Sequence, residues 1–526
     1  MFQSQFGTVL LVVLPFSAGK ILLECKESNS CYDELMHPDI DVPPFETYND
    51  EEKSSDFWLN GSKEFVEHQL KRELNKNVAK NVIFFIGDGM SLATIAASRL
   101  LLGGEEKSLY FQNFPYTGLV KTYCLDKTVP DSASTSTSYL RGVKANYGTI
   151  GVDGRVKRKD CEAMLDEKTH VYSIAKWAMD AGKFAGLVTT TRVTHASPAG
   201  VYAHTADRDW ENDSKLKKDC SSKNLRDIAD QLVHGDVGSR LKVILGGGRR
   251  EFRDIHADPE EGREGARSDG RDLIKEWLAK AGKNENRTYV YNRDQLLRVD
   301  ALRTDKLLGL FEDTHMLYHL EAEEMNLGRE KPTLVDMTTK AIELLQKSDK
   351  GYFLFVEGGK IDLAHHRVHT RLALDETIEL SKAVEAARKM TNSSDTLIVV
   401  SSDHSHTMSI SGYPSRKNDI FQVARTSDKD DLPYITLSYA NGRGFSKYYS
   451  TRKGKRINPL KINREKIKAQ FPSTVPLKTE THGGEDVAVF ASGPFDHLFT
   501  GVYEQNVLPH LMAYAACIGD GLKACD

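Results

Sequence analysis

The 526-residue chain has little of what marks several large protein classes. Seven cysteines are too few for a disulfide-rich scaffold of this length, and no Cys-x-x-Cys pair or zinc-finger spacing occurs among them. No apolar run reaches the ~18 residues of a membrane-spanning helix. Lys and Arg (71) nearly balance Asp and Glu (75), so nothing in the overall charge favours nucleic acid as a partner. What remains is a soluble globular protein, and a hydrophobic content of 40% is ample for a large core.

The two ends of the chain indicate where the protein works. A short apolar stretch from Thr8 to Phe16, followed by Ser17-Ala18-Gly19, predicts a signal peptide over residues 1–19; a buried N-terminal strand is the alternative. The C-terminus has no hydrophobic tail, so no lipid-anchor signal is visible. We therefore expect a secreted, extracellular protein. Four sequons would permit glycosylation, at Asn60, Asn212, Asn286 and Asn392.

Cysteine spacing alone allows several loops to be closed. Short loops could form near both ends and a longer one in between, with one cysteine left free. The pairs would be Cys25 with Cys31, Cys161 with Cys220 and Cys517 with Cys525, leaving Cys124.

Four short apolar runs each end in a polar cluster, and helical patterns lie between them. This alternation predicts an α/β fold with a central, mostly parallel sheet flanked by helices on both faces. In such sheets ligands bind beyond the carboxyl ends of the strands, so all four clusters should meet on one edge. The runs are Asn81 to Gly87 before Asp88, Phe184 to Thr191 before Arg192, Gly351 to Val356 before Glu357, and Thr396 to Ser402 before Asp403.

Other segments depart from the alternation. Residues 20–55 are acidic and polar and predict an extended arm, and Asp56 to Leu74 has the pattern of an amphipathic helix. Residues 250–330 are charged with few strand signals, and residues 412–480 are basic and rich in turns. We interpret both as insertions within one catalytic domain spanning residues 56–526. The basic run in the second could suggest nucleic acid, but a solvated insertion is the preferred interpretation.

Carboxylates and histidines gather at the predicted strand ends. Buried carboxylates are costly unless they are paired or bind a metal. Mixed carboxylate and imidazole ligands suit zinc, and a hydroxyl with carboxylates suits magnesium. Asp362 and His366 are four residues apart, so one helical turn would place them on one face. The full set is Asp88, Glu357, Asp362, His366, Asp403, His404 and His482.

Ser132 begins a predicted helix, in the sequence Val129-Pro-Asp131-Ser132-Ala. The positive end of that helix would favour an oxyanion on Ser132 and help to hold a phosphate. A serine that merely caps the helix is the alternative. No Gly-x-Ser-x-Gly elbow, P-loop or dinucleotide-binding fingerprint accompanies it.

Several motifs together resemble animal alkaline phosphatase, in that family's order, from about Asp56 to the C-terminus. They are Asn-Val-Ile-Phe-Phe-Ile-Gly-Asp88-Gly-Met, Val-Pro-Asp131-Ser132-Ala, Thr-Arg-Val-Thr-His195-Ala-Ser197, Phe-Val-Glu357-Gly-Gly, Asp403-His404-Ser-His406 and Glu480-Thr-His482-Gly-Gly. The resemblance implies hydrolysis of small phosphate monoesters at alkaline pH, with Ser132 as a nucleophile that becomes phosphoserine.

The resemblance also implies two zinc ions and one magnesium ion. Asp362, His366 and His482 would bind one zinc, and Asp88, Asp403, His404 and Ser132 the other. Asp88, Ser197 and Glu357 would bind magnesium, with His195 acting through a water. Arg208 would clamp the phosphate and Asp131 would orient Arg208. The pairs Cys161–Cys220 and Cys517–Cys525 match the family's disulfides. The resemblance also implies a homodimer, in which the helix at 56–74 reaches across to the partner and a crown-like insertion at 412–480 covers the interface. Tyr413 matches a residue that points from one subunit toward the other's active site.

The chain departs from the family at three positions that bear on the site. Ser134 stands where the family has Gly, and Leu363 where relatives carry a polar residue near the phosphate. Lys331 takes the place of an Asp in a calcium site whose other ligands match Glu260, Phe311 and Glu312, which puts calcium binding in doubt.

Two alternatives stay open. An inactive protein that keeps the fold for binding a partner would draw support from Ser134 and Leu363. A phosphodiesterase or sulfatase relative is disfavoured by Arg208, Ser197 and Glu357, since diesterases typically lack the arginine clamp and the third metal.

Overall fold

The computed structural model describes residues 50–220, 225–256 and 265–526. The predicted signal peptide, Cys25, Cys31, Glu260 and all but the last residues of the acidic arm lie outside the described residues. Among the described residues two disulfides are present, Cys161–Cys220 and Cys517–Cys525, and Cys124 is a buried free thiol. No helix in the described ranges is both long and apolar enough to cross a membrane.

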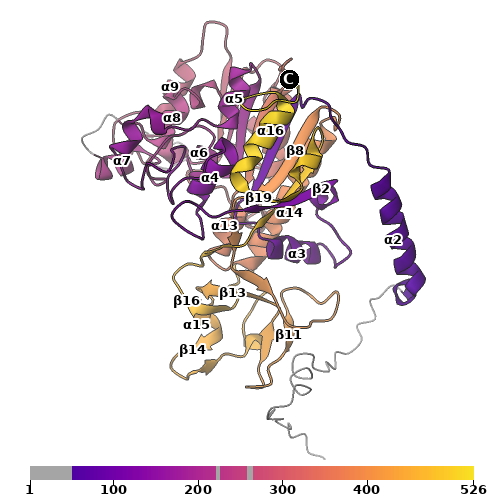
Figure 1. The fold of residues 1–526 in the computed structure, drawn as a ribbon. Coiled ribbons are helices and arrows are strands. Elements are labelled where there is room, and N and C mark those ends of the chain that lie inside the picture. Colours follow the sequence, from indigo (N-terminus) through magenta and orange to yellow (C-terminus); the bar gives the residue numbers. More distant parts are fainter. Residues whose placement is uncertain (1–49, 221–224, 257–264) are drawn as a thin grey trace, which may run out of the picture. The chain divides into compact units, whose positions relative to one another are not determined.

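A ten-stranded sheet forms the centre of the fold (Figure 1). All neighbouring strands are parallel except around β18, which is antiparallel to both β2 and β8. The order is β19 (Gly501–Glu504), β2 (Tyr116–Lys121), β18 (Val487–Ser492), β8 (Thr396–Ser402), β1 (Asn81–Gly87), β7 (Tyr352–Gly358), β3 (Phe184–Arg192), β4 (Val243–Gly247), β6 (Lys306–Leu310) and β5 (Arg287–Val290).

The four apolar runs predicted from the sequence are the four adjacent strands β8, β1, β7 and β3. Phe84 of β1 pairs in register with Val399 of β8 and Phe355 of β7, and all three side chains are fully buried. Strands covered on both faces need continuous apolar sequences, which explains why these runs lack alternation. The prediction of a mostly parallel sheet is confirmed.

Helices cover both faces of the sheet, and each face has its own hydrophobic core. On one face lie α4 (Ser132–Arg141), α5 (Ile174–Asp180), α8 (Ile228–His234), α9 (Leu273–Ala279) and α16 (Leu508–Ala516). On the other lie α3 (Leu92–Leu101), α12 (Leu334–Leu345), α13 (Lys360–His365) and α14 (Thr370–Lys389). Shorter helices are α6 (Ala196–Ala199), α7 (Asp213–Asp219), α10 (Arg293–Arg298) and α11 (His319–Glu324).

The interpretation of residues 250–330 as an irregular insertion needs correction. This range supplies β5 and β6, which extend the central sheet beyond β4. The strand signal was weak because β5 is only four residues long and lies at the sheet edge, where three of its side chains are partly exposed. An edge strand does not need the continuous apolar run of a central strand.

The crown-like insertion, residues 412–480, packs around a separate small core with Leu374 and Ala97. Its strands form three small sheets, one of which includes β10 (Met408–Ile410), and a short helix, α15 (Phe445–Tyr448), lies among them (Figure 1). A further short strand, β9 (Ser405–His406), precedes the insertion. The strands are β11 (Val423–Thr426), β12 (Pro433–Ile435), β13 (Leu437–Gly442), β14 (Tyr449–Ser450), β15 (Lys455–Arg456) and β16 (Ser473–Pro476), and β9 pairs with β17 (His482–Gly483) beyond it.

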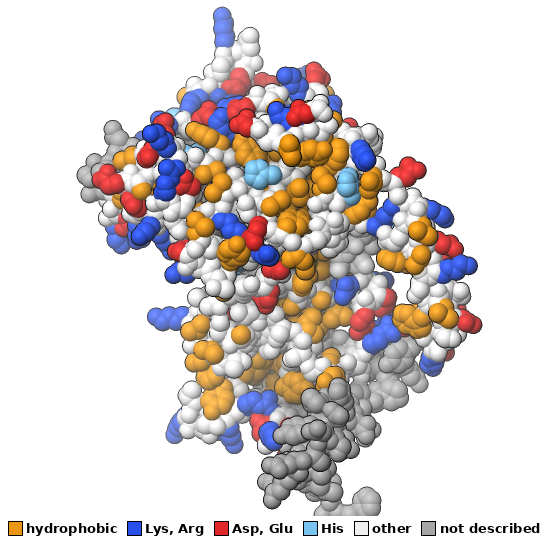
Figure 2. Space-filling view, in the orientation of Figure 1, with side chains coloured by type: hydrophobic (Ala, Val, Ile, Leu, Met, Phe, Trp, Pro, Cys, Tyr) orange, Lys and Arg blue, Asp and Glu red, His pale blue; other side chains and the backbone are white. Residues whose placement is uncertain are grey.

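The predicted N-terminal helix is α2 (Ser55–Leu70), capped by the Ser54 hydroxyl. None of its residues is buried. Trp58 and Phe65 are 55% and 64% exposed, and Figure 2 shows hydrophobic side chains on the surface of this helix. Large apolar side chains left open to water in this way mark a surface that associates with another one.

Candidate active site

The carboxyl ends of the four central strands bring the predicted site residues to one edge of the sheet. Asp88 follows β1, Asp403 follows β8, and Glu357 is the next-to-last residue of β7. Asp88, Glu357 and Asp403 are fully buried. This edge is where an open parallel sheet binds its ligands.

Ser132 is the first residue of α4, and Asp131, not Ser132, is the helix cap. The Ser132 hydroxyl lies 3.4 Å from Asp88 Oδ1 and 3.2 Å from His404 Nε2. His404 Nε2 is also 3.1 Å from Asp403 Oδ2. These four side chains therefore form one compact group at the positive end of a helix.

A second group lies around Asp362 in α13. Its Oδ1 is 3.4 Å from His366 Nε2 and 3.3 Å from His482 Nε2, and the two Nε2 atoms are 3.1 Å apart. Each ring donates its Nδ1–H to a backbone carbonyl, His366 to Glu480 and His482 to Pro130. Both Nε2 atoms therefore present lone pairs to the same point, an arrangement suited to a cation between them.

The third group surrounds Glu357. Its Oε2 accepts hydrogen bonds from the hydroxyls of Thr189 and Thr191, both in β3. Ser197 in α6 is fully buried, and its hydroxyl makes no hydrogen bond with a described residue. His195 caps α6, and its Nε2 lies 3.3 Å from Arg208 Nη2.

Arg208 is held by Asp131 in an ion pair of 2.9 Å. Asp131 is buried, and its other carboxylate oxygen accepts the backbone N–H groups of Ser134 and Gly148. Burial alone would raise the pKa of Asp131, but the Arg208 charge and these hydrogen bonds lower it below its ordinary value. The arginine is thereby fixed next to the Ser132 helix.

The site holds more negative charge than its own cations neutralise. Burial, then the charges of Asp403, Asp362 and Glu357, raise the pKa of Asp88 well above its ordinary value, and burial raises that of Glu357 to about 7. Asp88 Oδ2 and Glu357 Oε1 are buried and accept no hydrogen bond from the part of the chain that the structure describes. Buried carboxylates of this kind are stable when they bind metal cations. Two sets of side chains have possible ligand atoms within 4.8 Å of one another: Asp88, Asp403 and His404; and Asp362, His404, His406 and His482. The residues present therefore fit metal cofactors.

Two residues of this region were not assigned a role from the sequence. His406 Nε2 lies 2.8 Å from Asp362 Oδ1, and its Nδ1 lies 2.6 Å from Glu480 Oε2. Burial alone would lower the pKa of His406, but Glu480 and Asp362 outweigh it and raise the pKa to about 10. The available signal in the sequence was a second histidine two residues after His404, directly beyond β8.

The position matched to a calcium site is occupied differently. Lys331 Nζ lies 2.8 Å from Glu312 Oε1 and 3.1 Å from the carbonyl oxygen of Phe311. The lysine ammonium thus contacts two of the groups that the resemblance assigns to calcium. The third, Glu260, is outside the described residues.

Comparison with known proteins agrees with this geometry. Residues 79–518 match the family model described as alkaline phosphatase. The chain belongs to the alkaline phosphatase family. It is 45% identical over 487 residues to the membrane-bound alkaline phosphatase of Bombyx mori, covering 90% of this chain and 87% of that one. It is 44% identical over 489 residues to the tissue-nonspecific isozyme of Rattus norvegicus, covering 90% and 91%.

Solved structures show the same fold. Thermus thermophilus alkaline phosphatase aligns with a TM-score of 0.60 at 21% identity, covering 87% of this chain and 96% of that one. As an alkaline phosphatase, the protein is a hydrolase of phosphate monoesters with metal-binding groups at the strand ends.

Proposed function

We propose that this alkaline phosphatase hydrolyses phosphate monoesters through a phosphoserine at Ser132. The observation that carries the proposal is the position of the Ser132 hydroxyl, at the N-terminus of α4 and 3.4 and 3.2 Å from Asp88 and His404. A serine that only capped the helix would stand at the cap, which Asp131 occupies.

The chain's own residues account for the course of the reaction. The Ser132 oxygen attacks phosphorus; a new phosphorus–serine bond forms as the ester bond breaks, and the alcohol leaves with a proton. Water then attacks phosphorus, the phosphorus–serine bond breaks, and phosphate leaves while Ser132 regains its proton. Arg208 can grip two phosphoryl oxygens at once, and Asp131 holds the guanidinium in place.

We assign the metal positions as follows. One zinc would be held by Asp362, His366 and His482, the other by Asp88, Asp403, His404 and Ser132, and magnesium by Asp88, Ser197 and Glu357, with His195 acting through a water. When bound, these ions supply Lewis acidity that stabilises the attacking and leaving oxygens. The lone pairs of His366 and His482 and the unpartnered oxygens of Asp88 and Glu357 support the assignment.

The test is hydrolysis of a chromogenic phosphate monoester between pH 7 and 10. The protein is stripped with a chelator and then restored with zinc and magnesium, beside a Ser132→Ala variant. We expect turnover that rises with pH, needs the metals and is lost in Ser132→Ala, with phosphate trapped on Ser132 and detected by mass spectrometry at low pH. A zinc-loaded protein that never forms phosphoserine would sink the proposal in favour of the inactive, partner-binding alternative.

We also propose that the protein is a secreted homodimer. The exposed apolar face of α2 and the exposed Tyr413 support an interface there. Phe65→Asp should yield a monomer in light scattering at micromolar concentration, whereas Glu64→Lys, its neighbour, should not. A monomeric wild type would overturn the assignment.

Glycosylation fits only three of the four sequons. Asn60, Asn286 and Asn392 are exposed. Asn212 is 1% exposed, caps α7 and donates its side-chain N–H to Glu251, so a glycan cannot be attached there in the folded protein. Glycopeptide mapping of the secreted protein should find Asn212 unmodified.

A further inference from the structure

The hydroxyl of Ser134 lies against the residue that holds the arginine clamp. It is fully buried, 2.8 Å from Asp131 Oδ1 and 3.0 Å from the carbonyl oxygen of Asp131. A glycine or alanine at this position would make neither contact.

Asp131 has three tasks, and its two carboxylate oxygens divide them. Oδ2 pairs with Arg208 at 2.9 Å. Oδ1 caps the nucleophile helix through the Ser134 N–H at 3.2 Å and accepts the Gly148 N–H at 3.0 Å. Rotation of this carboxylate would move Arg208, because the guanidinium follows Oδ2.

We propose that Ser134 is a positioning residue for the phosphate clamp: its hydroxyl fixes the carboxylate of Asp131 and, through it, Arg208. This rests on the proposed function of Arg208. The Ser134 O–H donates one proton, and the charged Oδ1 is the stronger acceptor of its two partners.

Loss of this hydrogen bond should weaken phosphate binding more than it slows the chemical steps. For Ser134→Ala we expect the KM for a monoester and the inhibition constant of inorganic phosphate to rise about 3- to 10-fold, the range for one ordinary hydrogen bond, because the lost contact reaches Arg208 only through Asp131. The kcat should stay within about twofold.

The matched control is Ser136→Ala, which removes a buried hydroxyl from the same helix that bonds only to the Ala133 carbonyl oxygen. The decisive comparison repeats Ser134→Ala in an Asp131→Ala background, where it should have no further effect on the inhibition constant. Unchanged phosphate inhibition in Ser134→Ala, or an equal effect without Asp131, would overturn the proposal. Failure of the proposed function would look different, because the wild type itself would then lack turnover.

A separate feature lies in the crown-like insertion, which is strongly basic. Residues 412–480 contain 15 Lys and Arg against six Asp and Glu, within a chain whose net charge is −4. Arg452, Lys453 and Lys455 are exposed at the turn between β14 and β15, with Lys447 in the preceding helix, and none of the four forms an ion pair with a described residue. These side chains are free to meet a negatively charged partner.

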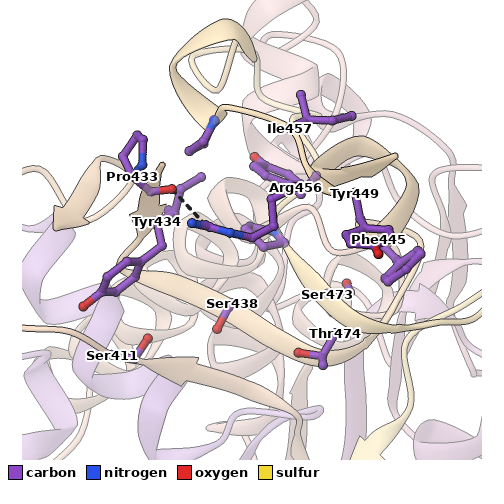
Figure 3. A pocket seen from close by; sticks show the side chains of 14 residues that line it. Ser411, Pro433, Tyr434, Ser438, Phe445, Tyr449, Arg456, Ile457, Ser473 and Thr474 are labelled. Atoms are coloured by element: carbon purple, nitrogen blue, oxygen red, sulfur yellow. Dashed lines mark hydrogen bonds between the residues drawn. The ribbon is translucent and has the colours of Figure 1, made fainter. Parts of the chain in front are cut away.

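A pocket of about 400 Å³ opens beside this turn. Figure 3 shows the rings of Phe445 and Tyr449 on one side and Tyr434 on the other, with the hydroxyls of Ser438 and Thr474 between. Ser473, which is 8% exposed and also lines the pocket, has a buried hydroxyl that makes no hydrogen bond within the described ranges. Arg456 is held by Asp430 and by the Pro433 carbonyl oxygen.

Aromatic walls with a few hydroxyls and a size within the ~300–1,000 Å³ of small-molecule sites indicate a ring-shaped, polar ligand. The cations at the rim indicate that the ligand carries negative groups outside the pocket. We infer that the crown-like insertion binds an acidic polysaccharide, with one sugar ring in the pocket and its anionic groups on Lys447, Arg452, Lys453 and Lys455. The two disulfides favour an oxidising, extracellular compartment over the cytosol and nucleus. We therefore take the polyanion to be a polysaccharide and not a nucleic acid.

The test is binding of the intact enzyme to heparin, with dextran as the neutral probe and single-stranded DNA as the competing polyanion, at several salt concentrations. The variants are the triple Arg452→Ser, Lys453→Ser, Lys455→Ser and the pocket-filling Ser438→Trp. The control triple, Lys107→Ser, Lys157→Ser, Lys283→Ser, removes the same charge from exposed lysines elsewhere. We expect heparin binding to be at least tenfold weaker in the first triple variant and about threefold or more weaker in Ser438→Trp. Phosphatase activity should be unchanged in both.

Three results would overturn this inference. The first is a loss of heparin binding in the control triple as large as in the first triple. The second is no effect of Ser438→Trp on heparin binding, and the third is binding to single-stranded DNA as tight as to heparin. Loss of the dimer in Ser438→Trp without a change in heparin binding would assign the pocket to a second copy of the chain instead.

Discussion

Two places in this molecule gather oxygen atoms as if for a cation, and they are satisfied in different ways. At the sheet edge, Asp88 and Glu357 each keep a buried oxygen that has no hydrogen-bond partner among the described residues, and the pKa of each is raised. Beside Phe311 and Glu312, the Lys331 ammonium supplies the positive charge itself. The comparison teaches that unpaired buried carboxylates, rather than acidic residues as such, mark a metal site.

The largest expected effect separates these two places by chelation. Exhaustive treatment with a chelator of zinc and magnesium should reduce activity to below about 1% and lower the Tm, because the buried carboxylates then lose their counter-charge. A calcium-selective chelator with zinc and magnesium kept in excess should change neither. Activity assays and differential scanning fluorimetry measure both, and a fall in Tm caused by removing calcium alone would contradict the assignment of Lys331 as the resident cation.

The next effect concerns Arg208, the fixed cation of the active site. Arg208→Lys keeps the charge but cannot grip two phosphoryl oxygens or match the fork of Asp131, so kcat/KM should fall about 10²-fold. Arg155→Lys is the control, because Arg155 forms an ion pair with Asp153 at the surface, and it should leave kcat/KM unchanged. Steady-state kinetics on one monoester measure the change. A kcat/KM close to the wild-type value in Arg208→Lys would contradict the role of Arg208 as the phosphate clamp.

A third substitution tests whether calcium can bind beside Glu312 when Lys331 is replaced by an acidic residue. Lys331→Asp should lower the Tm in the presence of a calcium chelator, since a second carboxylate then faces Glu312. Millimolar calcium should raise the free energy of unfolding of this variant by about 1–3 kcal/mol and should leave that of the wild type unchanged. Lys350→Asp, an exposed lysine, controls for the added charge. If calcium raised the Tm of all three proteins equally, the site would not be at Lys331.

Sequence patterns predicted the central strands and the residues at their ends because burial on both faces leaves a continuous apolar signal. The geometry confirms that Asp88, Glu357 and Asp403 share one edge of the sheet. The contact of His406 with Glu480 could not be predicted, because β9 and β17 have only two residues each and join segments 74 residues apart. Strands this short carry no periodicity.

Ser134 and Lys331 illustrate a second limit of the sequence. A substitution in a familiar motif is visible at once, but its consequence depends on which atoms it reaches. The Ser134 hydroxyl could have disturbed the nucleophile helix; in the structure it bonds to the helix cap. Lys331 could have pointed to solvent; it lies between a carbonyl and a carboxylate.

The smallest expected effect comes from a third kind of cation, one that depends on pH. A hydrogen bond to Asp375 raises the pKa of His319 to about 9, from an ordinary value of 6.5. Its Nδ1 is 3.0 Å from Asp375, and its Nε2 is 3.4 and 3.8 Å from Glu323 and Glu379. Because the folded-state pKa is raised, the stabilisation is complete below about pH 6.5 and is lost as the pH rises through about 9.

His319→Gln tests this by removing the titrating group. Since His319 is only half-buried, screening should reduce its contribution to about 1 kcal/mol. The free energy of unfolding in urea should therefore differ by about that amount between wild type and variant at pH 6, and by almost nothing at pH 10. His68→Gln, an exposed histidine of α2, should show no difference at either pH. A gap that stayed constant from pH 6 to pH 10 would mean that packing, not charge, explains the effect of His319.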